Sequence, residues 1–431
     1  MISNSFDINS KGHLTVGGVD SVDLANKYGT PMYVVDEDAV RTNCALFRES
    51  IKEHYEGNGL CVYASKAFCC KEICRVIAEE NCGLDVVSGG EIYTALKAGF
   101  PMENVFFHGN NKTYDEIKLA LESNVGRIIV DNLTELKLLN ALCEELKREA
   151  NIYFRVKPGV DAHTHDFIRT GQIDSKFGFA YETGEALDAI RESMQYERIN
   201  LIGLHCHIGS QIFDIEPFVT AANIMIDFMK EAKDKLGVTL SELDLGGGFG
   251  IKYTDSDTPV PYESFMGPVA SKVKALCKEY GLSVPKIIIE PGRSIIAPAG
   301  ATLYTVGNVK TIPDVRTYVS IDGGMGDNPR YILYGSKYEI LCANKASEPK
   351  DTTVTLAGKC CESGDLIQEN APLQKVEAGD IVAVLATGAY NYSMASNYNR
   401  IPRLPVVFVR NKQDRLVIRR ETYEDIISCD L

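Results

Sequence analysis

Polar residues of unlike chemistry recur near the ends of short apolar runs in the first two thirds of the chain. Lys66, in YASKAF, is one of them. A lysine buried at a strand end loses hydration, which lowers its pKa and makes its amine a nucleophile or a Schiff-base partner. The alternative is a lysine that has passed the strand end and reached solvent. The other residues at such ends are Asp85, Ser88, His108, Arg155, Lys157, His207, Ser210, Gly246, Gly247, Gly248, Glu290 and Arg293.

Two glycine-containing motifs follow the last two of these runs. GGGFG at 246–250 lets backbone N–H groups approach an anion closely, so this loop could hold a phosphate. It is not a GxGxxG fingerprint and it lacks the Walker lysine, so a nucleotide site is not indicated. In EPGR, Glu290 could hold a proton on a ring nitrogen, and Arg293 could pair with a carboxylate or a phosphate. The alternatives are a tight strand-to-helix turn and a surface salt bridge.

The histidines point to a competing class of enzyme. Four of the seven histidines form two HxH pairs, His163/His165 and His205/His207. Residues i and i+2 of a strand share a face, so His205 and His207 could form part of a zinc hydrolase site. No carboxylate accompanies either pair in a recognisable pattern, and we therefore expect no metal. The alternative role for His205 is that of a hydrogen-bonded core residue.

The motif CCESGD at 360–365 lies late in the chain. It lacks CxxC spacing, so neither a zinc ribbon nor a thioredoxin motif fits. Cys361 could donate a proton, and Glu362 could receive a substrate ammonium. The alternative is a buried thiol beside an exposed acid.

The elements that must position these residues alternate in type along the chain. Amphipathic segments such as 134–149 and 215–237 separate the apolar runs, and early runs start 22 to 25 residues apart. Eight such units predict a closed parallel (β/α)8 barrel, with an open doubly wound sheet as the alternative. Catalytic groups of such a barrel lie at the C-terminal ends of its strands. The eight predicted strands are 60–67, 82–88, 104–109, 127–132, 152–159, 201–210, 242–250 and 285–293.

The pattern changes after about residue 294. Strand-like runs, among them ATLYTVGNVKTI, TTVTLAG and LPVVFVR, follow one another without long helices between them. This pattern predicts a second, mainly antiparallel β domain. The fold class is therefore α/β, with a barrel domain over 35–293 and a β domain over 294–431. We expect residues 1–34 to pack on the β domain.

The composition excludes several classes of protein. Hydrophobic residues make up 45% of the 431 residues and charged residues 24%, which is typical of a globular protein. The net charge of −14 disfavours nucleic acid as a partner. No apolar run approaches the roughly 18 residues that suggest a membrane span. The start, MISNSFDINSKGHL, does not resemble a secretion signal, so we interpret the 13 cysteines as reduced thiols of a cytoplasmic protein.

Taken together and in order, the motifs resemble one family. YASKAF, DVVSGGE, HGNNK, RVKPGVDAHTH, KFGF, GLHCHIGSQI, LDLGGGFGI, EPGRSI, DGGMGDNPR, LYG, CESGD and GAYNYSMASNYN are similar to those of the diaminopimelate decarboxylases. That family belongs to the alanine-racemase-like, fold-type III group of pyridoxal phosphate enzymes. The resemblance covers residues 15 to 425, approximately. A dozen motifs in the right order are specific, although each alone is weak.

The resemblance implies roles around pyridoxal phosphate. Lys66 would carry the cofactor, His207 would stack on its pyridine ring, and Glu290 would hold the pyridinium proton. The phosphate would lie against Ser210, the glycine loop and the EPGR backbone. The cofactor-binding set is then Lys66, Asp85, His207, Ser210, Gly246, Gly247, Gly248, Glu290, Pro291, Gly292, Arg293 and Tyr390.

The resemblance also implies the reaction. Meso-diaminopimelate would lose one carboxylate and leave as L-lysine, the last step of lysine biosynthesis. Arg293, Arg330, Tyr334 and Tyr390 would bind substrate. In a homodimer with shared sites, Cys361 of the neighbouring subunit would be the proton donor and Glu362 would pair with the distal amine.

Two relatives of the same fold remain as alternatives. An ornithine or arginine decarboxylase has no distal carboxylate to bind, and a non-catalytic pyridoxal phosphate-binding protein resembles the barrel alone. The chain departs from the family pattern at Tyr331, where we expect proline, and at Leu404-Pro405-Val406, where an acidic residue is more usual.

Overall fold

The computed structural model describes residues 1–160 and 175–431, so the pair His163/His165 lies outside the described residues. The chain divides into two compact units. The barrel unit comprises 43–250 and 259–292, and the sheet unit comprises 1–42, 251–258 and 293–431. The expected domain limits, 35–293 and 294–431 with 1–34, stay a prediction about the folding units.

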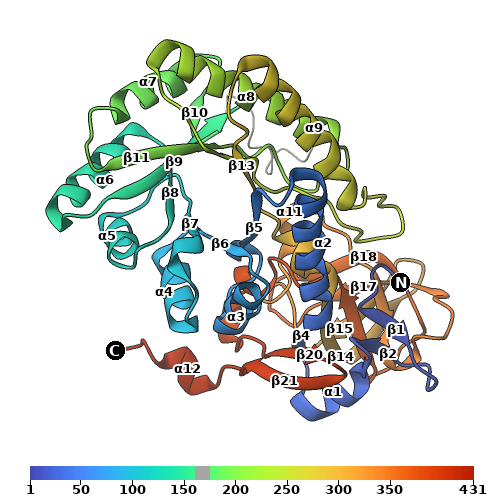
Figure 1. Ribbon diagram of the computed structural model, residues 1–431. Coiled ribbons are helices and arrows are strands. Elements are labelled where there is room, and N and C mark those ends of the chain that lie inside the picture. Colours follow the sequence, from blue (N-terminus) through green and yellow to red (C-terminus); the bar gives the residue numbers. More distant parts are fainter. Residues whose placement is uncertain (161–174) are drawn as a thin grey trace. The chain divides into compact units, whose positions relative to one another are not determined.

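The barrel unit contains a closed ring of eight parallel strands, as predicted (Figure 1). The last strand pairs with the first, and a further short strand, β10 (Phe179–Ala180), pairs with β9 outside the ring. Five predicted runs contain a strand of the ring, and the other three overlap one that begins one or two residues earlier. These strands are β5 (Gly59–Ala64), β6 (Gly83–Val86), β7 (Val105–Phe107), β8 (Arg127–Val130), β9 (Ala150–Lys157), β11 (Ile199–His205), β12 (Glu242–Asp244) and β13 (Lys286–Ile289).

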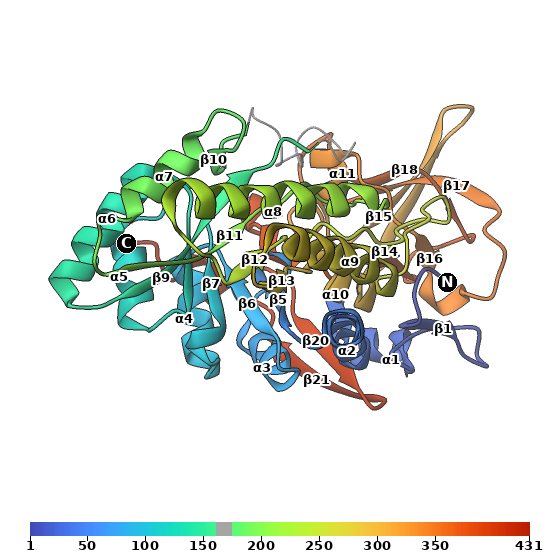
Figure 2. The ribbon, with the colours of Figure 1, turned by 45° about the horizontal axis from the view of Figure 1, so that its top comes forward.

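The helices of the barrel unit follow from their apolar spacing and their caps. In α6 (Leu133–Leu146), the buried residues Leu136, Leu139 and Leu142 recur at three-residue spacing, and Asn132 caps the first turn. Helices α8 (Glu216–Leu236) and α9 (Glu263–Tyr280) run side by side (Figure 2). The others are α3 (Lys71–Glu79), α4 (Gly89–Ala98), α5 (Tyr114–Glu122), α7 (Glu185–Ser193) and, from residue 43 on, α2 (Glu37–Tyr55).

The barrel interior is filled by large side chains. Val62, Phe106, Ile129, Tyr153 and Ile288 form one buried cluster, with 1% or less of each exposed. At the N-terminal ends of β8 and β12, Arg127 forms a salt bridge of 2.8 Å with Glu242, which also accepts a hydrogen bond from the Tyr153 hydroxyl. This end is therefore closed by packing and an ion pair, and substrate chemistry is left to the opposite, C-terminal rim.

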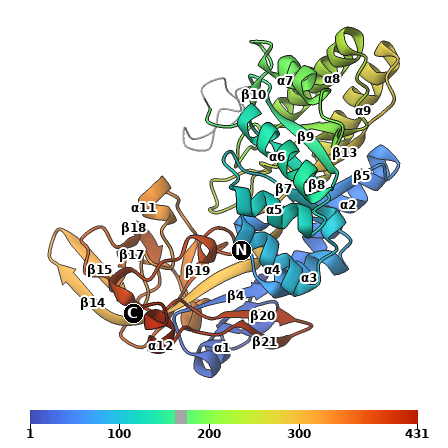
Figure 3. The same cartoon turned by 90° about the vertical axis from the view of Figure 1, so that its left-hand side faces the viewer.

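The sheet unit is mainly antiparallel, as predicted, and Figure 3 shows β14, β15, β17 and β18 in its main sheet. The strand order is β18-β17-β15-β14-β4-β20-β21, and β19 pairs with both β14 and β16. The pairs β15–β17 and β4–β20 are parallel. The strands are β4 (Met32–Asp36), β14 (Gly300–Ile312), β15 (Arg316–Ile321), β16 (Ile340–Cys342), β17 (Thr352–Ala357), β18 (Leu366–Leu373), β19 (Ile381–Leu385), β20 (Val406–Arg410) and β21 (Gln413–Ile418).

The N-terminal segment is more regular than its sequence suggested. Three short strands, β1 (Phe6–Ile8), β2 (Leu14–Val16) and β3 (Val19–Asp20), form a small sheet. They precede the helix α1 (Ser21–Tyr28), which Asp20 caps at its start and Gly29 ends. Among the described helices, none is both long and apolar enough to span a membrane.

Candidate active site

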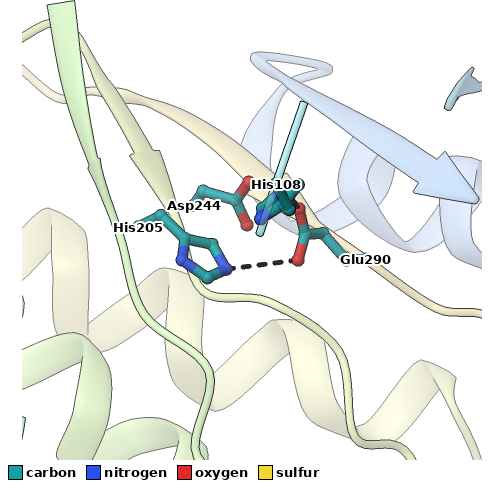
Figure 4. A group of neighbouring side chains, drawn as sticks. All are labelled: His108, His205, Asp244 and Glu290. Carbon is teal, nitrogen blue, oxygen red and sulfur yellow. Dashed lines mark hydrogen bonds and ion pairs between the residues drawn. The ribbon is translucent and has the colours of Figure 1, made fainter. Parts of the chain in front are cut away.

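Titratable side chains from several strands converge at the C-terminal rim of the barrel (Figure 4). His108 follows β7, His205 and Asp244 end β11 and β12, and Glu290 follows β13. One ligand atom from each of these four residues lies within 4.8 Å of the others. Because parallel strands end together at one rim, the topology alone brings these residues together.

Glu290 is the centre of this group. One carboxylate oxygen, Oε1, lies 2.7 Å from His108 Nε2, and the other, Oε2, lies 3.2 Å from His205 Nε2. Burial alone would raise the pKa of Glu290, but His108 and His205 outweigh burial and hold this pKa well below its ordinary value. Burial lowers the pKa of His205 to about 3. Glu290 is therefore an ionised carboxylate, and His205 is a neutral imidazole.

Two other buried carboxyl groups of the rim, Asp85 and Asp244, have the opposite tendency. Burial raises the pKa of Asp85, and burial together with the charge of Glu290 raises the pKa of Asp244 well above its ordinary value. Asp244 Oδ1 accepts a hydrogen bond of 2.9 Å from the N–H of Gly246. Asp244 thus fixes the start of the glycine loop rather than supplying a second full negative charge.

The glycine loop passes close to two neighbouring strand ends. Gly246 and Gly248 have φ values of 67° and 110°, which favour glycine. A Cβ at Gly247 would lie 2.1 Å from the carbonyl oxygen of Glu290, and one at Gly248 would lie 2.4 Å from that of Gly209. No side chain fits at these two positions, so the backbone itself forms this surface of the rim.

His207 and Ser210 follow β11 near the same loop. The N–H of Gly247 donates a hydrogen bond of 3.3 Å to His207 Nδ1. Burial and the nearby charges of Lys66 and Arg155 lower the pKa of His207 well below its ordinary value. His207 is thus a neutral ring whose remaining proton is on Nε2. Ser210 is half-buried five residues beyond the end of β11.

Lys66 lies at this rim, but it is exposed. Strand β5 ends at Ala64, and Lys66 occupies the middle of a single 3₁₀ turn, Ser65–Ala67. Its charge acts on Asp85, Glu91 and His207, which locates the ammonium among the residues of the site. Of the two readings of the sequence, the structure shows the lysine that has passed the strand end and reached solvent, because β5 ends two residues before it.

The EPGR motif packs against the end of β5. The N–H of Ala64 donates a hydrogen bond of 3.2 Å to the carbonyl of Pro291. A Cβ at Gly292 would lie 2.8 Å from the Cβ of Ala64. The backbone of Pro291 and Gly292 thus links β5, which precedes Lys66, to the position of Glu290.

A second cluster of predicted residues lies within the sheet unit. The guanidinium carbon of Arg293 lies 4.9 Å from the ring centre of Tyr390, and that of Arg330 lies 5.1 Å from the same ring. Arg330 also lies 5.1 Å from the ring of Tyr334, within the helix α11 (Arg330–Tyr334). Arg293 and Arg330 are only 7% and 8% exposed. In the described part of the chain, no carboxylate forms a salt bridge with Arg330, and its Nε lacks a hydrogen-bond partner.

Tyr253 belongs to the same cluster and was missed from the sequence. Arg293 Nη1 donates a hydrogen bond of 2.6 Å to the Tyr253 hydroxyl, and the Tyr253 ring packs edge-on against Tyr338 at 5.3 Å. Asp257 accepts hydrogen bonds from the N–H groups of Tyr253 and Thr254 and so fixes this segment. The only feature of the sequence that could have indicated Tyr253 is its position three residues after the glycine loop.

The backbone of the loop that carries Cys361 and Glu362 is held by hydrogen bonds, while the side chains of these two residues are exposed. The buried Asp365 accepts hydrogen bonds from the N–H groups of Cys360, at 2.7 Å, and Met325, at 2.6 Å. The N–H of Cys361 donates to Asn399 Oδ1 at 2.8 Å. The side chains of Cys361 and Glu362 are exposed, so the alternative of a buried thiol is wrong.

The two departures from the expected pattern involve other contacts. The Tyr331 hydroxyl donates a hydrogen bond of 3.0 Å to Glu369, away from the guanidinium of Arg330. The carbonyl of Pro405 accepts a hydrogen bond of 3.0 Å from the N–H of Tyr33 in β4. Both residues therefore serve the packing of the sheet unit.

Comparisons with known proteins agree with this geometry. Residues 38–297 match the family model of the pyridoxal-dependent decarboxylase, pyridoxal binding domain. The chain is 50% identical over 426 residues to diaminopimelate decarboxylase of Bacillus subtilis strain 168, covering 98% of this chain and 96% of that protein. It also matches two solved diaminopimelate decarboxylases in complex with L-lysine. The one from M. jannaschii has a TM-score of 0.91 and 36% identity, covering 99% of this chain and 98% of that chain. The one from Helicobacter pylori has a TM-score of 0.86 and 31% identity, covering 95% and 98%.

Proposed function

Because the chain belongs to the diaminopimelate decarboxylase family of pyridoxal-dependent decarboxylases, we propose that it converts meso-diaminopimelate to L-lysine and carbon dioxide. The observation that carries the substrate assignment is the pair of buried guanidiniums at Tyr390. Diaminopimelate differs from ornithine and arginine by a second carboxylate at its distal end. A site for it therefore needs a cation that ornithine and arginine do not need.

Arg330 meets that requirement. A buried guanidinium without an acidic partner is unfavourable unless an anion arrives with the ligand. Arg330 forms no salt bridge within the described residues and is held against the rings of Tyr334 and Tyr390. Arg293, oriented by the Tyr253 hydroxyl, lies at the same Tyr390 ring. We assign the distal carboxylate to Arg293 and Arg330, with Tyr334 and Tyr390 beside it.

The residues of the barrel rim fit pyridoxal phosphate. The glycine loop leaves room for an anion only along its backbone, since Gly247 and Gly248 cannot carry a side chain. Glu290 is buried, ionised and suited to a protonated ring nitrogen. The phosphate would be held by Ser210, Gly246, Gly247, Gly248 and the backbone of Pro291 and Gly292. Lys66 would bond to the aldehyde carbon, and Asp85 and His207 would lie against the ring.

In the reaction, the cofactor, when bound, accepts the electron pair that the departing carboxylate leaves behind. Glu290 keeps a proton on the ring nitrogen, where the negative charge develops. The neutral His207 offers a ring face without adding positive charge. Cys361 Sγ gives a proton to the carbon that has lost its carboxylate, and Glu362 holds the distal ammonium. Lys66 would again hold the cofactor once the product has left.

The exposure of Cys361 and Glu362 supports a shared site. Two exposed reactive side chains on an anchored loop are available to a second copy of the chain. We propose a homodimer in which each copy supplies this loop to its partner. A cytoplasmic location fits the thirteen cysteines, all of which are free thiols.

Carbon dioxide release from three substrates tests the proposal. Purified protein with pyridoxal phosphate should release carbon dioxide from meso-diaminopimelate, with much smaller kcat/KM for L-ornithine and L-arginine. Arg330→Gln should raise KM for meso-diaminopimelate, whereas Arg316→Gln, which removes the Glu369 salt bridge in the same unit, should not. A larger kcat/KM for ornithine or arginine would show that the protein is an ornithine or arginine decarboxylase. A colourless, inactive protein with stoichiometric zinc would support the hydrolase.

A further inference from the structure

The proposed function uses Glu290 but gives no role to the two histidines that hold it. His108 Nε2 and His205 Nε2 each approach a different oxygen of the Glu290 carboxylate, at 2.7 Å and 3.2 Å. The three side chains are 5%, 1% and 6% exposed, respectively for His108, His205 and Glu290. Figure 4 shows the His205 ring directed at Glu290, with the contact drawn as a dashed line.

Both histidines are themselves fixed by the barrel. The N–H of His108 donates a hydrogen bond of 2.8 Å to the carbonyl of Val86 in β6. His205 is the last residue of β11, paired with Arg155 of β9 and Asp244 of β12. The two rings contact each other edge to face, with centres 4.8 Å apart. The backbone position of each ring is therefore set by neighbouring strands.

The Glu290 carboxylate is contacted at both oxygens, by a hydrogen bond with His205 at Oε2 and by a close ion-pair contact with His108 at Oε1. Two such contacts restrict the plane of the carboxylate. Each carboxylate oxygen has two lone-pair directions, so one imidazole on each oxygen leaves room for another donor. Without these donors, a buried carboxylate would take up a proton or rotate toward another partner. A protonated Glu290 could no longer keep a proton on a ring nitrogen.

We propose that His108 and His205 are positioning residues that hold the Glu290 carboxylate ionised and oriented toward the ring nitrogen of pyridoxal phosphate. This inference rests on the proposed function and extends it. The histidines act through Glu290 and do not touch the reacting carbon. The same four groups, His108, His205, Asp244 and Glu290, have a spacing that a divalent cation could also use, and the test separates the two cases.

The experiment compares apolar and hydrogen-bonding replacements in the holoenzyme. His108→Leu and His205→Leu remove the donor, while His108→Gln and His205→Gln keep an N–H donor of similar reach. His54→Leu, in the last turn of α2, is the matched control. For each variant, kcat, KM for meso-diaminopimelate, the dissociation constant of pyridoxal phosphate, the visible spectrum of the bound cofactor and the metal content are measured.

Each leucine variant should lower kcat about 10- to 100-fold, as expected for loss of one close polar contact to a buried charge. KM should stay within about threefold of wild type, because the substrate contacts are unchanged. The visible spectrum should shift, since Glu290 would no longer be held ionised and oriented toward the ring nitrogen. The glutamine variants should recover most of the activity and the wild-type spectrum. In a Glu290→Gln background the histidine replacements should have little further effect on kcat.

Three outcomes would overturn the inference. Leucine variants with wild-type kcat and spectrum would show that Glu290 does not need the two histidines to stay ionised and oriented. Glutamine variants no better than leucine would mean that the rings matter for packing alone. Stoichiometric zinc or manganese in wild type, lost in the variants, would make the histidines metal ligands.

The design also covers poor folding and failure of the proposed function. If the leucine variants do not fold, the glutamine variants in the wild-type and Glu290→Gln backgrounds still measure the coupling. If wild type decarboxylates none of the three substrates, the proposed function fails. The spectrum of bound pyridoxal phosphate still shows whether His108 and His205 affect Glu290 and the ring nitrogen.

Discussion

Burial sets the charge of some side chains of the site and leaves others free to react. Glu290 and His205 are enclosed, and their protonation states are fixed by their surroundings. Lys66 and Cys361 are exposed, so each can reach a ligand from solvent. In the proposed mechanism, the enclosed groups keep a fixed charge, and the exposed Lys66 and Cys361 would form or break bonds to carbon and hydrogen.

Cys361 should therefore be sensitive to conservative replacement. We expect Cys361→Ala to lower kcat about 10²- to 10⁴-fold, the usual contribution of a positioned acid, with little change in KM. Cys360→Ala, which removes the neighbouring thiol, is the control and should stay within about tenfold of wild type. Steady-state decarboxylation of meso-diaminopimelate measures both. Full activity in Cys361→Ala would require another proton donor.

Sequence reasoning identified most residues of the rim because strand ends mark them. Glu290, His207 and the glycines followed predicted strands and do meet at one end of the barrel. It left the environment open where the local chain path decides it. Lys66 is exposed because the turn after β5 carries it outward, and Tyr253 joins Arg293 through a loop without a motif. The spacing of apolar residues predicts neither the turn that exposes Lys66 nor the loop path that brings Tyr253 to Arg293.

At the scale of elements, the segments after β7 and β8 are tied together by a buried ion pair. Lys112 Nζ donates to Glu135 Oε1 and to the carbonyls of Gly109 and Ile129, at 2.7, 2.8 and 2.7 Å, respectively. Glu135 Oε2 in turn accepts a hydrogen bond from the N–H of Asp131. Burial lowers the pKa of Lys112, so the pair depends on its geometry. This link holds the loop that begins at His108.

Removing one member of this pair should destabilise the barrel. Lys112→Met removes the donor to Glu135 Oε1 and to two carbonyls, and we expect a loss of about 3–5 kcal/mol in the free energy of unfolding. The thermal midpoint should fall clearly, whereas exposed Lys137→Met on α6 should leave it nearly unchanged. The double variant Lys112→Met/Glu135→Leu should recover part of the loss. An unchanged midpoint in Lys112→Met would contradict the structural role of the pair.

Elements with strong periodicity were predictable, and elements that depend on tertiary pairing were not. All eight barrel strands lie within or overlap the predicted runs. Strand β18 escaped prediction because its sequence, LIQENAPL, contains polar residues and proline. The segment 251–258 groups with the sheet unit, since Glu339 donates a backbone hydrogen bond to the carbonyl of Tyr253. Such a contact has no signature in local sequence.

At the scale of the whole molecule, the proposed site needs residues from two copies. Lys66 belongs to the barrel unit, and Cys361 lies on an exposed loop of the sheet unit. If each site combines Lys66 of one copy with Cys361 of the partner, two different inactive variants can complement one another. A dimer of one Lys66→Ala copy and one Cys361→Ala copy would contain one intact site.

Mixing the two inactive variants tests this arrangement. After dissociation and random reassociation of equal amounts, half of the dimers are mixed, and about a quarter of wild-type activity should return. Each variant treated alone should remain inactive, and size-exclusion chromatography with light scattering reports the oligomer. A mixture without activity, despite mixed dimers, would place both residues of a site in one copy or outside the site.

The attachment of the cofactor to Lys66 can be measured directly. The holoenzyme is reduced with borohydride, digested, and analysed by mass spectrometry for a lysine that carries a stable pyridoxyl phosphate group. We predict one modified peptide, spanning YASKAF and modified at Lys66, with loss of the visible absorption on reduction. The modification should be absent from Lys66→Ala. A pyridoxyl group on another lysine of the native enzyme, or none on a protein that decarboxylates meso-diaminopimelate, would contradict the proposed site.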